Sequence, residues 1–180
     1  NRPALTREVF DTIRQQKPKF LFVAADGPRP DRKDDIEKCK AAREIINPDW
    51  DCELYTLYRD ENLGCGRGPA EAISWFFKHV EQGIILEDDV IPSMSFFRYC
   101  SELLEIYRDE QRVFMISGIN LLSPWKAEES SYTFAYLGGI PAWATWKRAW
   151  DKFDYLLKEW ETLNSKVRIK RMLLHNGIYN

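Results

Sequence analysis

Three consecutive acidic residues, Glu87, Asp88 and Asp89, are the part of this sequence best suited to chemistry. They follow residues 83–86, a short apolar run of the kind that forms a buried strand. Two like charges 4 Å apart repel by about 1 kcal/mol in water and about 4 kcal/mol at an effective dielectric of 20, so a positive partner is expected. A divalent cation would serve, because carboxylate oxygens bind such ions and leave positions for phosphate oxygens. On residue types alone, an acidic turn exposed to water is an equally good interpretation.

The elements that would position these acids follow from the spacing of apolar residues. Helical spacing predicts helices, and apolar runs bounded by turn residues predict strands. Pro18 ends the first helix, and Pro69 suits the first turn of a helix that follows a glycine-rich loop at 62–69. In chain order we predict a helix at 5–16, a strand at 20–25, a helix at 34–46, a strand at 52–59, a helix at 69–80, a strand at 83–86, a helix at 95–107, strands at 113–117 and 132–137, and a helix at 147–160.

This alternation predicts an α/β fold with a mostly parallel sheet and helices on both of its faces. Ligands of such sheets bind beyond the carboxyl ends of the strands. Asp26 follows the strand at 20–25, and the three acids follow the strand at 83–86. We therefore expect both to lie at the edge of the sheet where ligands bind.

Composition and charge limit the kinds of partner. The 180 residues suit one domain, and 26 basic residues nearly balance 28 acidic ones, so no overall field would recruit nucleic acid. No apolar run approaches the ~18 residues of a membrane span, which predicts a soluble chain without a transmembrane segment. Four widely spread cysteines with only two histidines argue against a zinc site and favour free thiols.

Aromatic residues are frequent in the second half of the chain. Trp143, Trp146 and Trp150 have the spacing of one helix face, which predicts core packing for at least two of them. Gly138 and Gly139, just before them, would let a sugar approach the backbone closely.

The segment 84–90, with the residues 92–99 that follow it, resembles the strand, acidic triplet and helix of N-acetylglucosaminyltransferase I and its bacterial relatives of the GT-A type. Four further segments resemble that family in the same order: 1–3, 25–27, 62–64 and 138–144. The resemblance spans nearly the whole chain. It implies a GT-A (Rossmann-like) sheet flanked by helices, without its first strand and its C-terminal part. We therefore expect residues 1–180 to be a single nucleotide-sugar-binding domain from a longer protein.

The resemblance implies roles for the three acids. Asp89, which matches the last acid of the family's triplet, would be the direct ligand of Mn²⁺ (or Mg²⁺). Asp88 and Glu87 would hold the ribose or the sugar of the donor.

The resemblance also implies donor contacts elsewhere in the chain. Arg2 and Asp26 would contact the uridine, with the Asp26 carboxylate accepting the base N–H. Arg67, in the glycine-rich loop, would approach the nucleotide. Asp26 could instead be a turn residue before Gly27, and Arg67 a loop arginine exposed to water.

The implied activity is the transfer of a sugar such as GlcNAc from a UDP-sugar donor to a hydroxyl of a glycan or glycolipid acceptor, with inversion. Inversion needs a catalytic base, which in the family lies in an acidic and aromatic segment after the aromatic helix. Asp151, Asp154, Glu159 and Glu161 lie too early for that role. The catalytic base is therefore expected beyond Asn180.

Two alternatives stay open. One is a non-catalytic nucleotide-sugar or carbohydrate-binding domain derived from a transferase. The other is a nucleotidyltransferase or phosphohydrolase, although the sequence shows no nucleophile or phosphate clamp beside the acids. The resemblance to bacterial enzymes implies a cytoplasmic protein, at most peripheral to a membrane.

Overall fold

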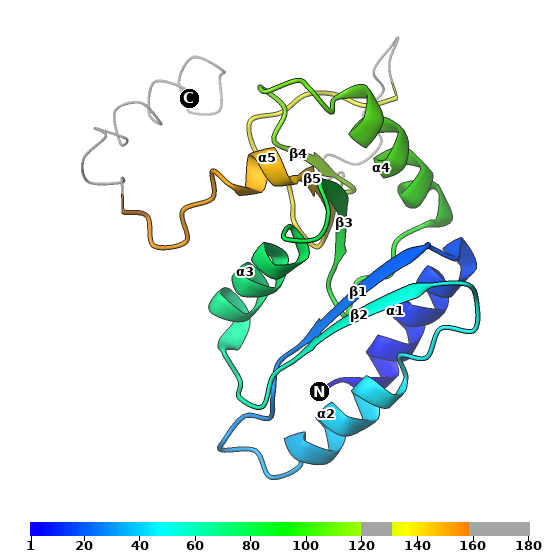
Figure 1. Cartoon of the computed structure of the whole chain (residues 1–180), viewed down its shortest axis with the longest axis vertical. Helices are drawn as coiled ribbons and strands as arrows, with labels where there is room; N and C mark the ends of the chain where they lie inside the picture. Colours follow the sequence, from blue (N-terminus) through cyan, green and yellow to red (C-terminus); the bar gives the residue numbers. More distant parts are fainter. Residues whose placement is uncertain (120–130, 159–180) are drawn as a thin grey trace.

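The computed structural model describes residues 1–119 and 131–158, and these form an α/β structure (Figure 1). The chain alternates between helices and strands until two strands follow one another near the end of the described part. In order, the elements are α1 (Pro3–Gln16), β1 (Phe20–Ala25), α2 (Asp35–Glu44), β2 (Glu53–Tyr58), α3 (Gly64–Phe76), β3 (Gln82–Leu86), α4 (Met94–Ile106), β4 (Met115–Ser117), β5 (Ala142–Trp146) and α5 (Lys147–Trp150).

The first sheet is a parallel pair of strands. β1 and β2 run in register from Phe20 opposite Glu53 to Ala25 opposite Tyr58. α1 and α2 lie beside each other along this sheet, and α3 lies apart from them on the other side of it (Figure 1). Helices therefore cover both faces of the parallel pair, as predicted for an α/β unit.

The second sheet is antiparallel and contains the main hydrophobic core. Its strand order is β3-β5-β4, with β5 in the centre and buried at every position. α4 packs on this sheet, and the indole N–H of Trp146 donates to the carbonyl oxygen of Leu104 on that helix (3.0 Å). Burial raises the pKa of the Cys100 thiol in this core to about 12. The buried core residues are Phe96, Cys100, Leu103, Leu104, Ile116, Ala142, Ala144 and Trp146.

One aromatic side chain links the two sheets. The ring of Phe76, at the end of α3, packs edge-on against Phe22 of β1 with 5.0 Å between centroids. The same ring lies over Gly83 of β3, where a Cβ atom would come within 2.2 Å of Cζ of Phe76. Glycine at the second position of this strand lets another side chain approach the backbone closely.

The prediction of a mostly parallel sheet is confirmed only in part. The α/β class and the parallel pair are as expected, but the other three strands form an antiparallel sheet. The difference arises at β5, where the sequence analysis predicted no strand and interpreted the spacing of Trp143, Trp146 and Trp150 as that of one helix face. Its alternating alanine, threonine and tryptophan residues suit a fully enclosed strand, and burial between two neighbours decides their conformation.

Three local predictions are wrong. Trp143 and Trp146 lie on β5 rather than on a helix, and α5 ends at Trp150, followed by turns up to residue 158. The part of that predicted helix beyond 158 lies outside the described residues. The segment 132–137 is irregular and forms no strand.

The glycine-rich segment also differs from its predicted loop. α3 begins at Gly64, five residues before Pro69. Gly64 has a φ of +77°, in the left-handed region that glycine enters without strain, so it can open the helix. Pro69 lies inside the helix and cannot donate a backbone hydrogen bond there.

Candidate functional site

The three acids form a turn directly after β3. The backbone N–H of Val90 donates to the carbonyl oxygen of Glu87 (3.3 Å), which closes the turn. The side chains of Asp88 and Asp89 are 41% and 38% exposed, and that of Glu87 is exposed as well. The strand therefore delivers three carboxylates to the surface at its carboxyl end, where the sequence placed them.

Arg2 brings two of these carboxylates together. Its Nε donates to Oδ2 of Asp88 (3.2 Å), its Nη2 donates to Oδ1 of the same residue, and its Nη1 donates to Oδ2 of Asp89 (2.7 Å). These hydrogen bonds, above all those to Asp88, raise the pKa of the Arg2 guanidinium. We call these three residues the arginine–aspartate cluster.

The start of α1 fixes the backbone beneath this guanidinium. α1 begins at Pro3, whose ring favours the first helical position. The carbonyl oxygen of Arg2 accepts hydrogen bonds from the backbone N–H of Thr6 (2.9 Å) and from its hydroxyl group (3.0 Å). The backbone of Arg2 is therefore fixed at the N-terminal boundary of α1.

The neighbouring residue ties this cluster to the loop after β1. The side-chain amide of Asn1 donates to Oδ2 of Asp35 (3.1 Å), and Asp35 also accepts from Nε (2.6 Å) and Nη2 (2.9 Å) of Arg29. Arg29 belongs to the loop that follows β1, and Asp35 begins α2. Two consecutive residues thus contact the segment after β1 and the acids after β3, which places these two regions close to each other.

Asp26 lies at the carboxyl end of β1 in a separate network. Its Oδ1 accepts from Nη1 of Arg59 (3.0 Å) and its Oδ2 from the backbone N–H of Leu63 (2.9 Å). A Cβ at Gly68 would lie 2.9 Å from Oδ2 of Asp26, so the carboxylate also packs closely against α3. These contacts assign Asp26 a clear structural role, which is to hold the segment after β2 against the end of β1.

Arg67 lies on the exposed side of α3. Its Nε donates to Oε1 of Glu71 (2.6 Å), one helical turn away, and its side chain is 62% exposed. Nη2 of Arg59 lies 3.9 Å from the other oxygen of Glu71, so Asp26 and Arg67 belong to one chain of charges. No interaction between this chain of charges and the arginine–aspartate cluster is found in the described residues.

Sequence reasoning missed Arg59 and Glu71, although a signal for Arg59 was present. Two parallel strands in register carry the residues that follow them at the same edge. Asp26 follows Ala25, and Arg59 follows Tyr58, the partner of Ala25 in the ladder. A salt bridge at this position could have been predicted once the two strands had been aligned.

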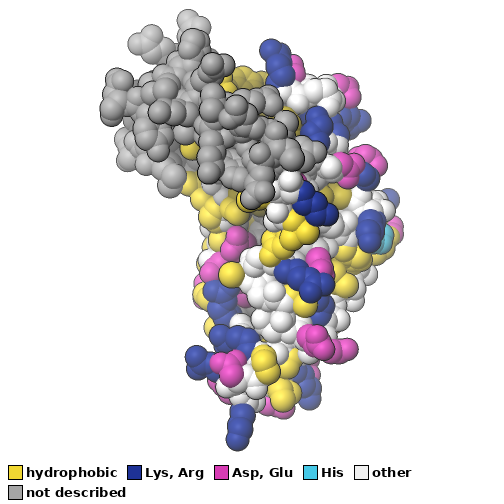
Figure 2. All heavy atoms as spheres, turned by 90° about the vertical axis from the view of Figure 1, so that its left-hand side faces the viewer, with side chains coloured by type: hydrophobic (Ala, Val, Ile, Leu, Met, Phe, Trp, Pro, Cys, Tyr) yellow, Lys and Arg dark blue, Asp and Glu magenta, His cyan; other side chains and the backbone are white. Residues whose placement is uncertain are grey.

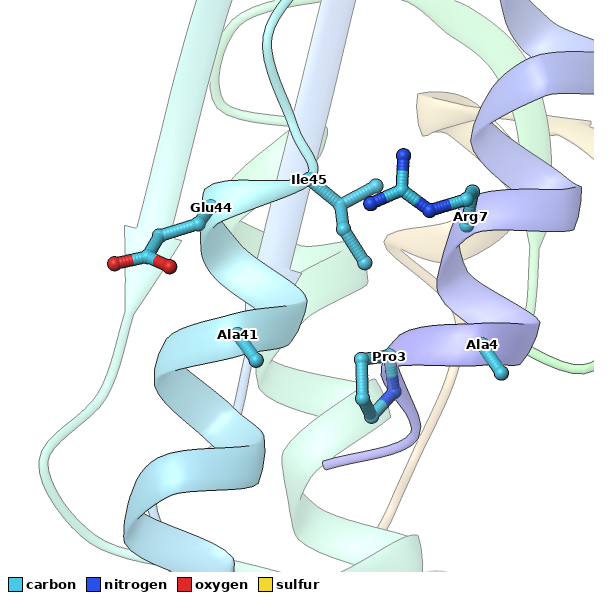
Figure 3. A pocket seen from close by; sticks show the side chains of 6 residues that line it. All are labelled: Pro3, Ala4, Arg7, Ala41, Glu44 and Ile45. Atoms are coloured by element: carbon cyan, nitrogen blue, oxygen red, sulfur yellow. The ribbon is translucent and has the colours of Figure 1, made fainter.

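Neither of two hollows in the described surface is lined by the three acids. One, of about 320 Å³, lies between α1 and α2. Figure 3 shows that Arg7 extends toward Ile45 there, whereas the carboxylate of Glu44 points away from α1, so no polar groups converge. The other, of about 630 Å³, lies between α2 and the end of β2 and includes Arg43 and Tyr58.

The surface carries no extended region of one charge on the face in view. Figure 2 shows basic, acidic and apolar side chains interspersed over its described part. This distribution agrees with the near balance of 26 basic and 28 acidic residues in the whole sequence. An anionic ligand would therefore depend on a local group of charges.

The cluster offers oxygen atoms that suit a hard cation. Asp88 and Asp89 both direct carboxylate oxygens at one guanidinium, so both side chains face the same cationic group. Within the described residues no group of three or more His, Cys, Asp or Glu side chains could hold a metal ion. A pair of carboxylates still fits Mg²⁺ or Mn²⁺, because such ions are commonly bound through one or two carboxylates with water and substrate phosphates completing the shell.

Comparison of the chain with protein-family models, with curated proteins and with solved structures gives no match. No helix among residues 1–119 and 131–158 is long and apolar enough to cross a membrane.

Proposed function

We propose that this chain is the nucleotide-sugar-binding domain of a metal-dependent, inverting glycosyltransferase with a GT-A fold. Its donor would be a UDP-sugar, and its acceptor a hydroxyl group of a glycan or glycolipid. Mn²⁺ or Mg²⁺ would bind at Asp89 and neutralise the diphosphate, which lowers the cost of charge that develops on the leaving group.

The observation that carries this proposal is the convergence of Asp88 and Asp89 on one cationic group after β3. Two carboxylates at the carboxyl end of a strand, directed at a single positive centre, form the kind of site that a divalent ion and a diphosphate can share. The contact of Asn1 with Asp35 supports the proposal, because it brings the loop after β1 to the same region. The resemblance of five segments to the family gives the sugar-transfer chemistry.

The residues of the chain would divide the work of donor binding. Asp89 would ligate the metal, and Asp88 and Glu87 would accept hydrogen bonds from hydroxyl groups of the ribose or the sugar. Positioning of the donor and electrostatic stabilisation of the leaving diphosphate would supply most of the rate. Arg67 would have to leave Glu71 to reach a nucleotide, and Asp26 would have to accept a base N–H beside its bond to Arg59.

A second candidate is a non-catalytic nucleotide-sugar or carbohydrate-binding domain. The observation that favours it is the pairing of Asp88 and Asp89 with Arg2, which satisfies both carboxylates without a metal ion. In a domain that no longer binds metal, Arg2 could neutralise these acids and so preserve the fold.

Binding of UDP with and without Mn²⁺, measured by isothermal titration calorimetry, separates these candidates. We expect UDP binding that depends on Mn²⁺ and is weakened at least tenfold by Asp89→Ala, since a lost charge-assisted contact costs about 1.5–3 kcal/mol. Glu102→Ala serves as the control, because it removes an exposed acid of α4 that pairs with Arg98 and lies outside the cluster. Binding of free sugars that needs no metal would support the non-catalytic domain, and the absence of metal-dependent UDP binding would contradict the proposed donor site.

A further inference from the structure

We propose that Arg2 is a built-in cation that neutralises Asp88 and Asp89 in the free protein and is displaced from them by the metal ion. This inference rests on the proposed function and adds a regulatory contact to the same site. In the free protein, Arg2 would therefore occupy the carboxylate oxygens that bind the metal.

The geometry of the contact supports competition for the same oxygens. Arg2 donates to both carboxylate oxygens of Asp88 and to Oδ2 of Asp89, so it uses three of the four oxygens that these two side chains offer. A metal ion bound by both oxygens of Asp89 needs the Oδ2 atom that the guanidinium occupies. The metal ion and the guanidinium would repel each other at this distance, because like charges 4 Å apart repel even in water.

The contact is strong enough to hold the acids and weak enough to be displaced. All three side chains are between 38% and 46% exposed, so solvent screens their attraction. Exposed ion pairs contribute little to stability, whereas a divalent ion carries twice the charge and accepts oxygen ligands on every side. The exchange therefore costs little, and metal binding can drive it.

The displaced guanidinium would lie beside the diphosphate. Arg2 is anchored at the start of α1 through the two bonds from Thr6, so its side chain can swing but its backbone stays close to the acids. An arginine fork donates two parallel hydrogen bonds to phosphate oxygens as readily as to a carboxylate. Arg2 would thus oppose binding of the metal alone and favour binding of the nucleotide once the metal is present.

Arg2 should weaken the binding of the metal alone and strengthen the binding of the nucleotide, so Arg2→Met should change these two affinities in opposite directions. This variant removes the charge and keeps much of the side-chain volume. We expect it to bind Mn²⁺ alone about fivefold more tightly than the wild type, measured from the electron paramagnetic resonance signal of free Mn²⁺. We expect its affinity for UDP at saturating Mn²⁺ to fall about tenfold. Arg2→Lys keeps the positive charge without the paired N–H donors of the guanidinium, so both of its affinities should lie between those of the wild type and Arg2→Met.

Arg98→Met is the matched control, since Arg98 forms an exposed pair with Glu102 one turn away on α4 and does not contact the cluster. It should leave the affinity for Mn²⁺ alone unchanged. A second measurement uses the wild type alone: Mg²⁺ added during NMR should shift the Nε–Hε signal of Arg2 and leave that of Arg98, which donates to Glu102, in place. Circular dichroism spectra would show that each variant is folded.

The outcomes separate the inference from the proposed function. If the wild type binds Mn²⁺ and Arg2→Met binds it equally or more weakly, Arg2 does not compete with the metal and the inference is wrong, while the donor site stands. If neither protein binds Mn²⁺ with or without UDP, the proposed function fails and the inference fails with it.

Discussion

At the scale of single residues, Asp35 shows what a buried carboxylate does in this chain. It is 1% exposed and accepts hydrogen bonds from Arg29 and Asn1. Hydrogen bonding by Arg29, the largest cause, holds the pKa of this carboxyl well below its usual value of 3.8. Its contacts link the start of the chain, the loop after β1 and the start of α2, so its charge contributes to the placement of all three.

This depressed pKa predicts a specific dependence of stability on pH. A carboxylate whose folded pKa lies below its unfolded pKa contributes stability that is fully present above the unfolded value and is lost as pH falls through the folded value. Asp35→Asn should therefore be less stable than the wild type at pH 7, and the difference should shrink as pH falls below about 4. Urea denaturation midpoints of both proteins at pH 7, 5, 4 and 3 measure this difference in stability.

The neighbouring Asp34 supplies the control for this prediction. It pairs with Lys38 on the surface with its side chain 62% exposed, so Asp34→Asn should change the urea midpoint much less at every pH. A difference between Asp35→Asn and the wild type that stays constant down to pH 3 would show that the charge of Asp35 is not the source of its contribution.

The same scale shows how far the site could be predicted from sequence. The position of Asp88 and Asp89 at the carboxyl end of a strand followed from an apolar run and a turn, because both signals are local. Arg2 was expected near the nucleotide, but its pairing with the acids joins residues 86 and 87 positions apart, which no local pattern encodes. Asp26 was expected at a strand end, and its salt bridge with Arg59 required the alignment of two strands.

At the scale of elements, the bounds of helices and strands were predicted best where the sequence carried a single pattern, either helical or strand-like. β1 has its predicted bounds, and α1, α2, β3 and α4 differ from theirs by one to three residues, since amphipathic spacing or an apolar run marks each of them. β5 was missed because its tryptophans also have the spacing of a helix face. Burial between β3 and β4 decides its conformation, and this is a tertiary effect.

The segment after α4 shows another contact that local patterns do not reveal. Arg148 of α5 donates to the carbonyl oxygens of Arg108 (2.7 Å), Val113 (3.0 Å) and Tyr107 (2.8 Å). Its guanidinium also lies 4.4 Å from the ring centroid of Trp146. A single cation therefore holds three backbone carbonyl groups of the segment that follows α4, from a position 35 to 41 residues later in the chain.

The glycines of α3 give a prediction at this scale. In an ordinary helix, Gly→Ala stabilises by about 0.5–1 kcal/mol. At Gly68 the added Cβ would lie 2.9 Å from Oδ2 of Asp26, a carboxylate fixed by Arg59 and Leu63. Gly68→Ala should therefore be destabilising by about 1–2 kcal/mol, because it must move a constrained carboxylate.

Gly66 is the matched position on the same helix. There the added Cβ meets the hydroxyl oxygen of Tyr155 at 2.8 Å, and that side chain is 48% exposed and can move aside. Gly66→Ala should be neutral or stabilising. Urea denaturation of both variants decides the matter, and equal effects at the two positions would show that Asp26 is not held as rigidly as its contacts indicate.

At the scale of the whole molecule, the described residues divide into two sheets without a shared backbone ladder. Side chains connect them instead. Phe76 packs against Phe22 of the parallel sheet and over Gly83 of the antiparallel sheet, while Asn1 and Arg2 contact the regions after β1 and β3. Since the proposed site draws on residues from both halves, its geometry depends on these connections.

Phe76→Ala tests whether the two sheets unfold together. Removal of a largely packed ring should cost about 2–4 kcal/mol, and it takes away a ring that contacts both β1 and Gly83. Native-state hydrogen exchange should then show β1 and β5 amides opening with different free energies, whereas in the wild type they should open with similar ones. Phe20→Ala is the control, because this β1 ring is 47% exposed and its removal should cost well under about 1 kcal/mol. If the amides of both strands lost protection equally in Phe76→Ala, the sheets would be coupled by something other than this ring, and the contacts of Asn1 and Arg2 would be the next to remove.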